Sequence, residues 1–207
     1  MESRQPTLDY KRTFLIGFGF FGISVLWTLY NAYVPIYLQA GHPAFDAPGE
    51  VGFGFRPGLT GVVMTLDNVA AFFLLPLIGV WSDRVWTRFG RRMPFILVLA
   101  PISIAAFLLI PVAVGMIPPE LSGQIEHLGG QLVFFMIAIG VFLLTMASFR
   151  TPVIALMPDL TPSPLRSQAN GVINLMGGLG TLIATLGSGL LYGLGRMVPS
   201  AFGGVLM

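Results

Sequence analysis

Long apolar segments alternate with short polar segments along this chain. Five apolar runs are long enough to cross about 30 Å of hydrocarbon as helices. They cover about residues 13–38, 58–81, 93–117, 131–156 and 168–195. No period-2 alternation typical of membrane barrels is present, so helices are the backbone form that satisfies its own polar groups in lipid. The pattern predicts an all-α membrane protein.

A further apolar run begins near Ser200, and the sequence stops at Met207. A helix confined to this run cannot span a bilayer. We therefore expect a bundle of six helices whose sixth member is cut short, with the rest of the polypeptide missing downstream.

Composition supports a lipid environment and excludes several kinds of chemistry. The chain is 55% hydrophobic and 10% charged, with more apolar surface than a soluble domain can bury. It contains no cysteine, and its two histidines, His42 and His127, fall in different predicted loops, so no metal site is expected. No nucleophile, base and orienting group can be assembled either, so we expect no enzymatic activity.

Basic residues are concentrated on one side of the predicted membrane. That side carries Arg4, Lys11, Arg12, Arg84, Arg88, Arg91, Arg92 and Arg166, and the other carries only Arg56 and Arg196. The positive-inside rule places residues 1–12 and the second and fourth loops in the cytoplasm of a cell that holds the protein in its inner or plasma membrane. This bias explains the net charge of +2 without a nucleic-acid partner. The opposite loops, residues 39–57 and 118–130, are expected to be solvated turns without chemistry.

Asp67 is the only acidic residue inside a predicted span, roughly 14 Å from the outer end of the second helix. A carboxylate at this depth is costly, so it normally faces a wet cavity and often carries a proton or binds a cation. A structural hydrogen bond to a neighbouring helix is the alternative. Asn68 points about 100° away from it on a helix and cannot serve the same face equally.

Arg150 follows a long uncharged stretch of the fourth helix. It could pair with Asp67 or bind substrate, and the alternative is that it extends to the cytoplasmic interface and anchors the helix end.

One face of the first predicted helix is polar and edged by aromatic rings. Its members are Ser24, Thr28, Asn31 and Pro35, flanked by Trp27 and Tyr30. Amides beside an indole suit a sugar, which has a polar rim and C–H faces that stack on aromatic rings. Close helix packing through small polar groups would give the same pattern. In the fifth helix, Asn170 and Asn174 are the expected lining residues, and its glycines are expected to permit close helix approach.

The second loop combines one carboxylate with several arginines between glycines and a proline. Its candidate gate residues are Gly79, Asp83, Arg84, Arg88, Gly90, Arg91 and Arg92. Such an acid can cap a helix or pair with an arginine, and the cations can engage helix C-termini, which would lock one conformation. A generic basic loop would account for the arginines but not for the aspartate, the glycines and the proline between which they lie.

This loop, residues 79–94, resembles the signature between the second and third helices of the major facilitator superfamily. Five residues, 85–89, separate Asp83 and Arg84 from Gly90, where one is usual, and this longer form is similar to the sucrose/proton symporters and the glycoside-pentoside-hexuronide cation symporters. Residues 150–171 resemble the connection between the fourth and fifth helices of that group.

The resemblance implies two six-helix bundles with substrate bound between them and alternating access. This chain would be the N-terminal bundle of a sugar transporter, partnered by the missing C-terminal half. Melibiose-type relatives carry cation-binding acids on the second helix, but Asp67 lies about a turn further from the cytoplasmic loop, so a proton is the expected coupling ion and sodium is less favoured. An exporter of another organic solute and a non-transporting membrane scaffold are the competing interpretations.

Overall fold

Five long helices form the described part of the protein. The computed structural model describes residues 8–45, 50–85, 87–88 and 92–202, apart from the side chains at 67, 70, 71, 82 and 191–202. The long helices are α1 (Tyr10–Gln39), α2 (Pro57–Arg84), α3 (Met93–Gly115), α4 (Gly129–Leu160) and α5 (Arg166–Phe202). Short 3-10 helices lie in the loops: η1 (Pro119–Leu121), η2 (Ile125–His127) and η3 (Ser163–Leu165). The predicted all-α fold is confirmed. Ser200, near which a sixth helix was expected to begin, lies within α5.

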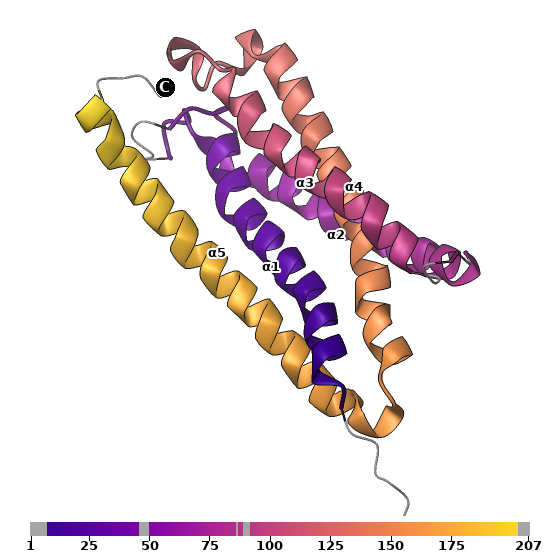
Figure 1. The fold of residues 1–207 in the computed structure, drawn as a ribbon. Coiled ribbons are helices and arrows are strands. Elements are labelled where there is room, and N and C mark those ends of the chain that lie inside the picture. The colour runs from indigo at the N-terminus through magenta and orange to yellow at the C-terminus, as the bar shows by residue number, and fades with distance from the viewer. Residues whose placement is uncertain (1–7, 46–49, 86, 89–91, 203–207) are drawn as a thin grey trace, which may run out of the picture.

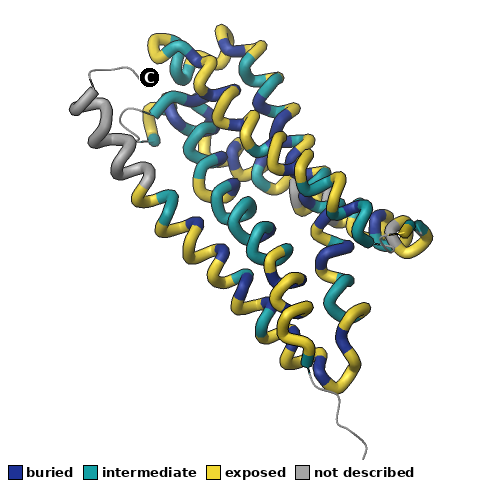
Figure 2. Tube along the Cα trace, in the orientation of Figure 1, coloured by how far each residue is buried: buried dark blue, intermediate teal, exposed yellow. Residues whose placement is uncertain are grey.

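The helices have the length and surface of membrane-spanning segments. α1, α3, α4 and the described part of α5 with its preceding 3-10 turn are long and apolar enough to cross a bilayer. In α2 two shorter apolar stretches are described, Pro57–Leu66 and Phe72–Trp81. Large apolar side chains point outward, including Leu15 and Phe72, which are 74% and 75% exposed. Exposed positions recur along the outer faces of the helices (Figure 2), as expected for a surface that meets lipid.

The helices pack mainly in pairs, α1 along α5 and α3 along α4, with α2 against α4 (Figure 1). The α1–α5 approach is closest at Gly180, where an added Cβ would lie 2.6 Å from the Phe21 carbonyl oxygen. A Cβ at Gly177 would meet the Ser24 hydroxyl at 3.2 Å. The expectation that the α5 glycines serve close packing therefore holds at these positions. It does not hold at Gly178, Gly187 and Gly189, which have open space within 4 Å.

Stacked aromatic rings hold the middle of the bundle together. Tyr30 is fully buried, and its ring stacks on Trp27 and Phe142 with centroid distances of 5.6 and 5.2 Å. Because α1 contributes Trp27 and Tyr30 and α4 contributes Phe142, this stack joins the two helices that flank the bundle's centre.

At the end of the bundle where α1 finishes, the loop after α1 folds back into the bundle. The amides of Phe53, Gly54 and Phe55 donate to the carbonyls of Tyr37, Ala40 and Leu38 at 3.0, 2.8 and 2.7 Å. These bonds satisfy acceptors that a helix C-terminus leaves free. Phe53 is fully buried, with its ring 4.9 Å from that of Phe135. The expectation of a fully solvated turn is therefore wrong here, because the loop provides both an aromatic anchor and partners for the helix end.

The loop after α3 fastens this arrangement. The Gly123 amide donates to the Gly52 carbonyl at 3.0 Å, and the Gly52 amide donates to the Ser122 hydroxyl at 3.2 Å. Gly123 has φ +81, and a Cβ there would lie 2.4 Å from the Gly41 carbonyl oxygen, so only glycine fits. We call residues 50–55 with residues 122–123 the loop clasp.

Candidate functional site

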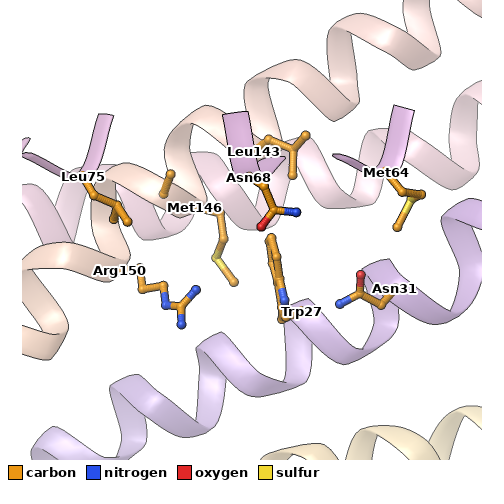
Figure 3. Close-up of a pocket in the computed structure, with 9 residues that line it drawn as sticks. Trp27, Asn31, Met64, Asn68, Leu75, Leu143, Met146 and Arg150 are labelled. Atoms are coloured by element: carbon orange, nitrogen blue, oxygen red, sulfur yellow. The ribbon is translucent and has the colours of Figure 1, made fainter. Parts of the chain in front are cut away.

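A cavity of about 380 Å³ lies between α1, α2 and α4 (Figure 3). It is lined by Trp27, Asn31, Met64, Asn68, Leu75, Leu143, Met146, Ala147 and Arg150. Its wall thus combines two amides, an indole and a guanidinium with thioether and aliphatic groups. Such a mixture of apolar surface and a few polar groups is typical of small-molecule sites.

α1 provides one side of the cavity. Trp27 and Asn31 are four residues apart, so both project from one face of the helix. In Figure 3 the Trp27 ring stands between Arg150 and Asn31. Tyr30 was expected beside them as a lining residue, but it is buried in the aromatic stack and is absent from the described lining of the cavity. Its ring supports the inner face of Trp27 instead.

On α2 the polar residue of the described lining is Asn68, whereas the sequence favoured its neighbour Asp67. Met64, Asn68 and Leu75 follow helical spacing along α2 and face the cavity together. Asp67 lies in α2, but its side chain is outside the described residues. A polar residue at i+4 from Met64 within an apolar run was the signal that could have singled out Asn68.

Arg150 projects from α4 into the same space. It lies ten residues before the end of α4 at Leu160, roughly 15 Å along the helix axis. It also lines a second cavity of about 150 Å³ between α1, α4 and α5. Within the described part of the chain, the Arg150 guanidinium has no ion-pair or hydrogen-bond partner.

The two asparagines of α5 are not placed at these cavities. Asn170 and Asn174 are exposed, and neither belongs to the described lining of either cavity. α5 instead contributes Thr181 to the smaller cavity. The α5 side chains that face α1 are Ala169, Ile173 and Met176, which are buried, so the register of α5 turns its asparagines outward.

At the opposite end of the bundle from the loop clasp, Arg92 joins two helix ends. Its guanidinium contacts Asp83 on α2 at 3.0 Å and Asp159 on α4 at 2.5 Å. The Arg92 side chain is only 12% exposed, whereas the two carboxylates are 54% and 44% exposed. We call Asp83, Arg92 and Asp159 the arginine bridge.

The other gate residues of the sequence have different surroundings. Arg84 and Arg88 are exposed, and Gly90 and Arg91 lie outside the described residues. At Gly79 a Cβ would meet the Thr151 methyl at 3.7 Å, which marks the approach of α2 to α4.

Asp159 was not among the expected gate residues, although it lies within residues 150–171, the second stretch that resembles the superfamily. Its partner Arg92 is 67 residues away in the chain, and sequence spacing alone does not reveal such a pair. Nearby, the Arg166 guanidinium donates to the carbonyls of Pro158 and Thr161 at 3.1 and 3.3 Å, which caps the end of α4.

A bundle of helices of membrane-spanning length with a partly polar cavity between them fits the architecture of a membrane transporter. Residues 13–206 match the Major Facilitator Superfamily, and the protein belongs to this superfamily of transporters.

Three relatives narrow the comparison. Proton-associated sugar transporter A from Homo sapiens is 38% identical over 96 residues, which are 46% of this chain and 11% of the relative. Sucrose transport protein SUC3 from Arabidopsis thaliana is 25% identical over 171 residues, 78% of this chain and 26% of the relative. Uncharacterized symporter sll1374 from Synechocystis sp. is 28% identical over 108 residues, 52% of this chain and 19% of the relative. The matched region is therefore at most about a quarter of each relative's length.

Proposed function

We propose that this chain is the ligand-binding half of a proton-coupled symporter for a sugar or glycoside. The observation that carries the proposal is the cavity wall, which combines the Trp27 indole with the amides of Asn31 and Asn68. An indole can stack on the C–H face of a sugar ring, and amides can both donate to and accept from its hydroxyls. Relatives named for sugar and sucrose transport support the same substrate class.

Three polar lining residues of the cavity, Asn31, Asn68 and Arg150, are exposed in the described chain. We infer that a second bundle completes the site and that the two bundles alternate in exposing it to each side of the membrane. The N-terminus and the arginine bridge would face the cytoplasm of an inner or plasma membrane, in line with the bias of basic residues. The bridge would then stabilise one of the two conformations by holding the cytoplasmic ends of α2 and α4 together.

Asp67 is the proposed proton carrier, and Arg150 is its candidate charge partner. Both roles rest on the cost of a charge at this depth of the membrane, which favours a group that alternates between charged and neutral forms or pairs with an opposite charge. A proton is proposed in preference to sodium because no second acid accompanies Asp67 on α2 before Asp83.

The coupling role is tested with Asp67→Asn in the full-length polypeptide, reconstituted in lipid vesicles. The amide retains shape and hydrogen bonding but cannot titrate. Accumulation of radiolabelled sucrose driven by a pH gradient should fall at least about tenfold, whereas exchange of sucrose at equal pH should stay within about twofold. Asp9→Asn, which removes a surface acid, is the matched control and should leave both unchanged.

Uphill accumulation that survives in the Asp67→Asn protein would contradict the coupling role. Loss of both accumulation and exchange would assign the carboxylate to substrate binding or folding instead. Failure of the unaltered protein to exchange any sugar or glycoside would refute the proposed substrate class.

A further inference from the structure

The smaller cavity, between α1, α4 and α5, is lined mainly by hydrogen-bond donors. Ser24 and Thr28 of α1, Arg150 of α4 and Thr181 of α5 line it, together with Ile23, Trp27 and Met146. Trp27, Met146 and Arg150 also line the larger cavity, so the two spaces share a wall. Three helices thus direct polar groups into a volume of about 150 Å³.

The hydroxyls of this cavity differ from several other hydroxyls of the bundle. A hydroxyl in an apolar helix normally donates to a carbonyl one turn earlier. Thr65, Thr145 and Thr185 do so at 2.7, 2.7 and 2.8 Å. Within the residues that the structure describes, the hydroxyls of Ser24 and Thr181 make no such bond, and neither does that of Thr28. These groups therefore remain available to a ligand.

Arg150 adds a permanent positive charge to the same space. A guanidinium presents five N–H donors and has no acceptor. Arg150 is exposed in the described chain, so its guanidinium can meet a ligand. A charge within a membrane-spanning helix is costly unless water or an anion compensates it. No described carboxylate lines either cavity, and the Asp67 side chain lies outside the described residues. If Asp67 carries a proton, as proposed above, its neutral form cannot compensate Arg150, and an anion in the cavity would do so in that state.

We propose that this cavity is a binding site for a small monovalent anion, held by the Arg150 guanidinium and the hydroxyls of Ser24, Thr28 and Thr181. An acceptor-only ligand with one negative charge matches a wall that supplies donors and one positive charge. A halide ion and a carboxylate group share this chemistry. The site is adjacent to the proposed sugar site but does not depend on it, because anion binding requires no transported solute.

Trp27 provides a direct probe, since its indole lines the cavity. The chain contains three tryptophans, and replacing Trp81 and Trp86 with phenylalanine leaves Trp27 as the only indole. The protein is placed in lipid nanodiscs and titrated with iodide, a heavy anion that quenches indole fluorescence, at constant ionic strength. Binding next to Trp27 should give quenching that saturates, and chloride should reverse it by competition.

Arg150→Gln should raise the iodide concentration at half-saturation at least about tenfold, because it removes the charge and most of the donors. Arg12→Gln is the matched control, because Arg12 is an exposed partner of Asp9 on the surface, and it should change nothing. Thr181→Val keeps the side-chain volume and should weaken binding about twofold to fivefold. This variant carries the test if Arg150→Gln does not fold. Quenching by neutral acrylamide should be equal in all variants.

Glucuronate is added in a parallel titration to distinguish the two anion sources. If chloride reverses the iodide quenching, the site binds an inorganic anion. If glucuronate reverses the quenching at a much lower concentration than chloride does, the site binds the carboxylate of an acidic sugar. Iodide quenching that rises without saturation in the protein with Arg150 would overturn the proposal. So would saturable quenching that persists unchanged in Arg150→Gln, or a saturable phase that neither anion reverses.

Discussion

The arginine bridge allows a quantitative prediction about how the ends of α2 and α4 are held together. Asp159→Asn removes the negative charge that receives the shorter of the two Arg92 contacts, at 2.5 Å, and keeps the side-chain shape. Asp83→Asn removes the other, at 3.0 Å. Arg92→Gln removes both contacts at once.

The expected magnitudes follow from exposure. A hydrogen bond to a charged group contributes about 1.5–3 kcal/mol, and a solvent-exposed ion pair only about 0.2–1 kcal/mol. The Arg92 side chain is largely shielded, but both carboxylates are about half exposed, so water screens one partner of each pair. We therefore expect Asp159→Asn to lower the free energy of unfolding by about 1 kcal/mol and Asp83→Asn by about 0.5 kcal/mol. Arg92→Gln should cost about the sum, roughly 1.5 kcal/mol.

The measurement is unfolding of the chain in mixed micelles of increasing SDS content, followed by circular dichroism. Glu126→Gln, at an exposed acid of η2 without an ion pair among the described residues, is the matched control. If the bridge is real, adding Asp159→Asn to Arg92→Gln should have almost no further effect, because the partner is already gone. High salt should reduce every difference. Additive losses in the double variant would refute the pairing of Arg92 with Asp159.

Two further predictions concern the loop clasp and the cavity. Gly123→Ala should lower the free energy of unfolding by about 1–3 kcal/mol, because its positive φ and the 2.4 Å approach to the Gly41 carbonyl exclude a Cβ; Gly187→Ala, in open space, should stay within about 1 kcal/mol of the original protein in the same SDS titration. Asn68→Ala should raise the half-saturating solute concentration in the exchange assay about fivefold or more, by loss of amide hydrogen bonds. Val69→Ala, at the neighbouring exposed position, should not, and equal effects of the two would remove Asn68 from the site.

Hydropathy predicted the helices well because lipid leaves the backbone few alternatives. α3 begins at Met93, the start of the expected span, and ends two residues before its expected limit at 117. α4 runs to Leu160, four residues past the expected end at 156, because prolines at 152 and 158 are accommodated inside the helix. Apolar runs thus show where helices lie, and the exact ends depend on loops and caps.

The candidate site was less predictable because it depends on how each helix is rotated in the bundle. Periodicity placed Asn31 on a polar face of the first helix with Trp27 at its edge, and the structure places both at the cavity. Tyr30, like Trp27, is an aromatic residue with a polar group. It is one position from Asn31, about 100° around the helix, so it faces α4, where it stacks on Phe142. The sequence does not show how α2 is rotated about its axis. The packing of α2 against α4 was needed to show that Asn68 faces the cavity.

The pairing of α1 with α5 has a consequence for how the protein is made. α1 is synthesised first, yet its most extensive partner is synthesised last among the described helices. The close approach of Gly180 to Phe21 joins positions about 160 residues apart in the chain, which at roughly 5–20 residues per second corresponds to a delay on the order of ten seconds or more. During that interval lipid or the insertion machinery must cover the polar groups of α1 that later face α5, Ser24 and Thr28. Biogenesis, rather than the finished bundle, is therefore the stage at which substitutions on this face are expected to be most harmful.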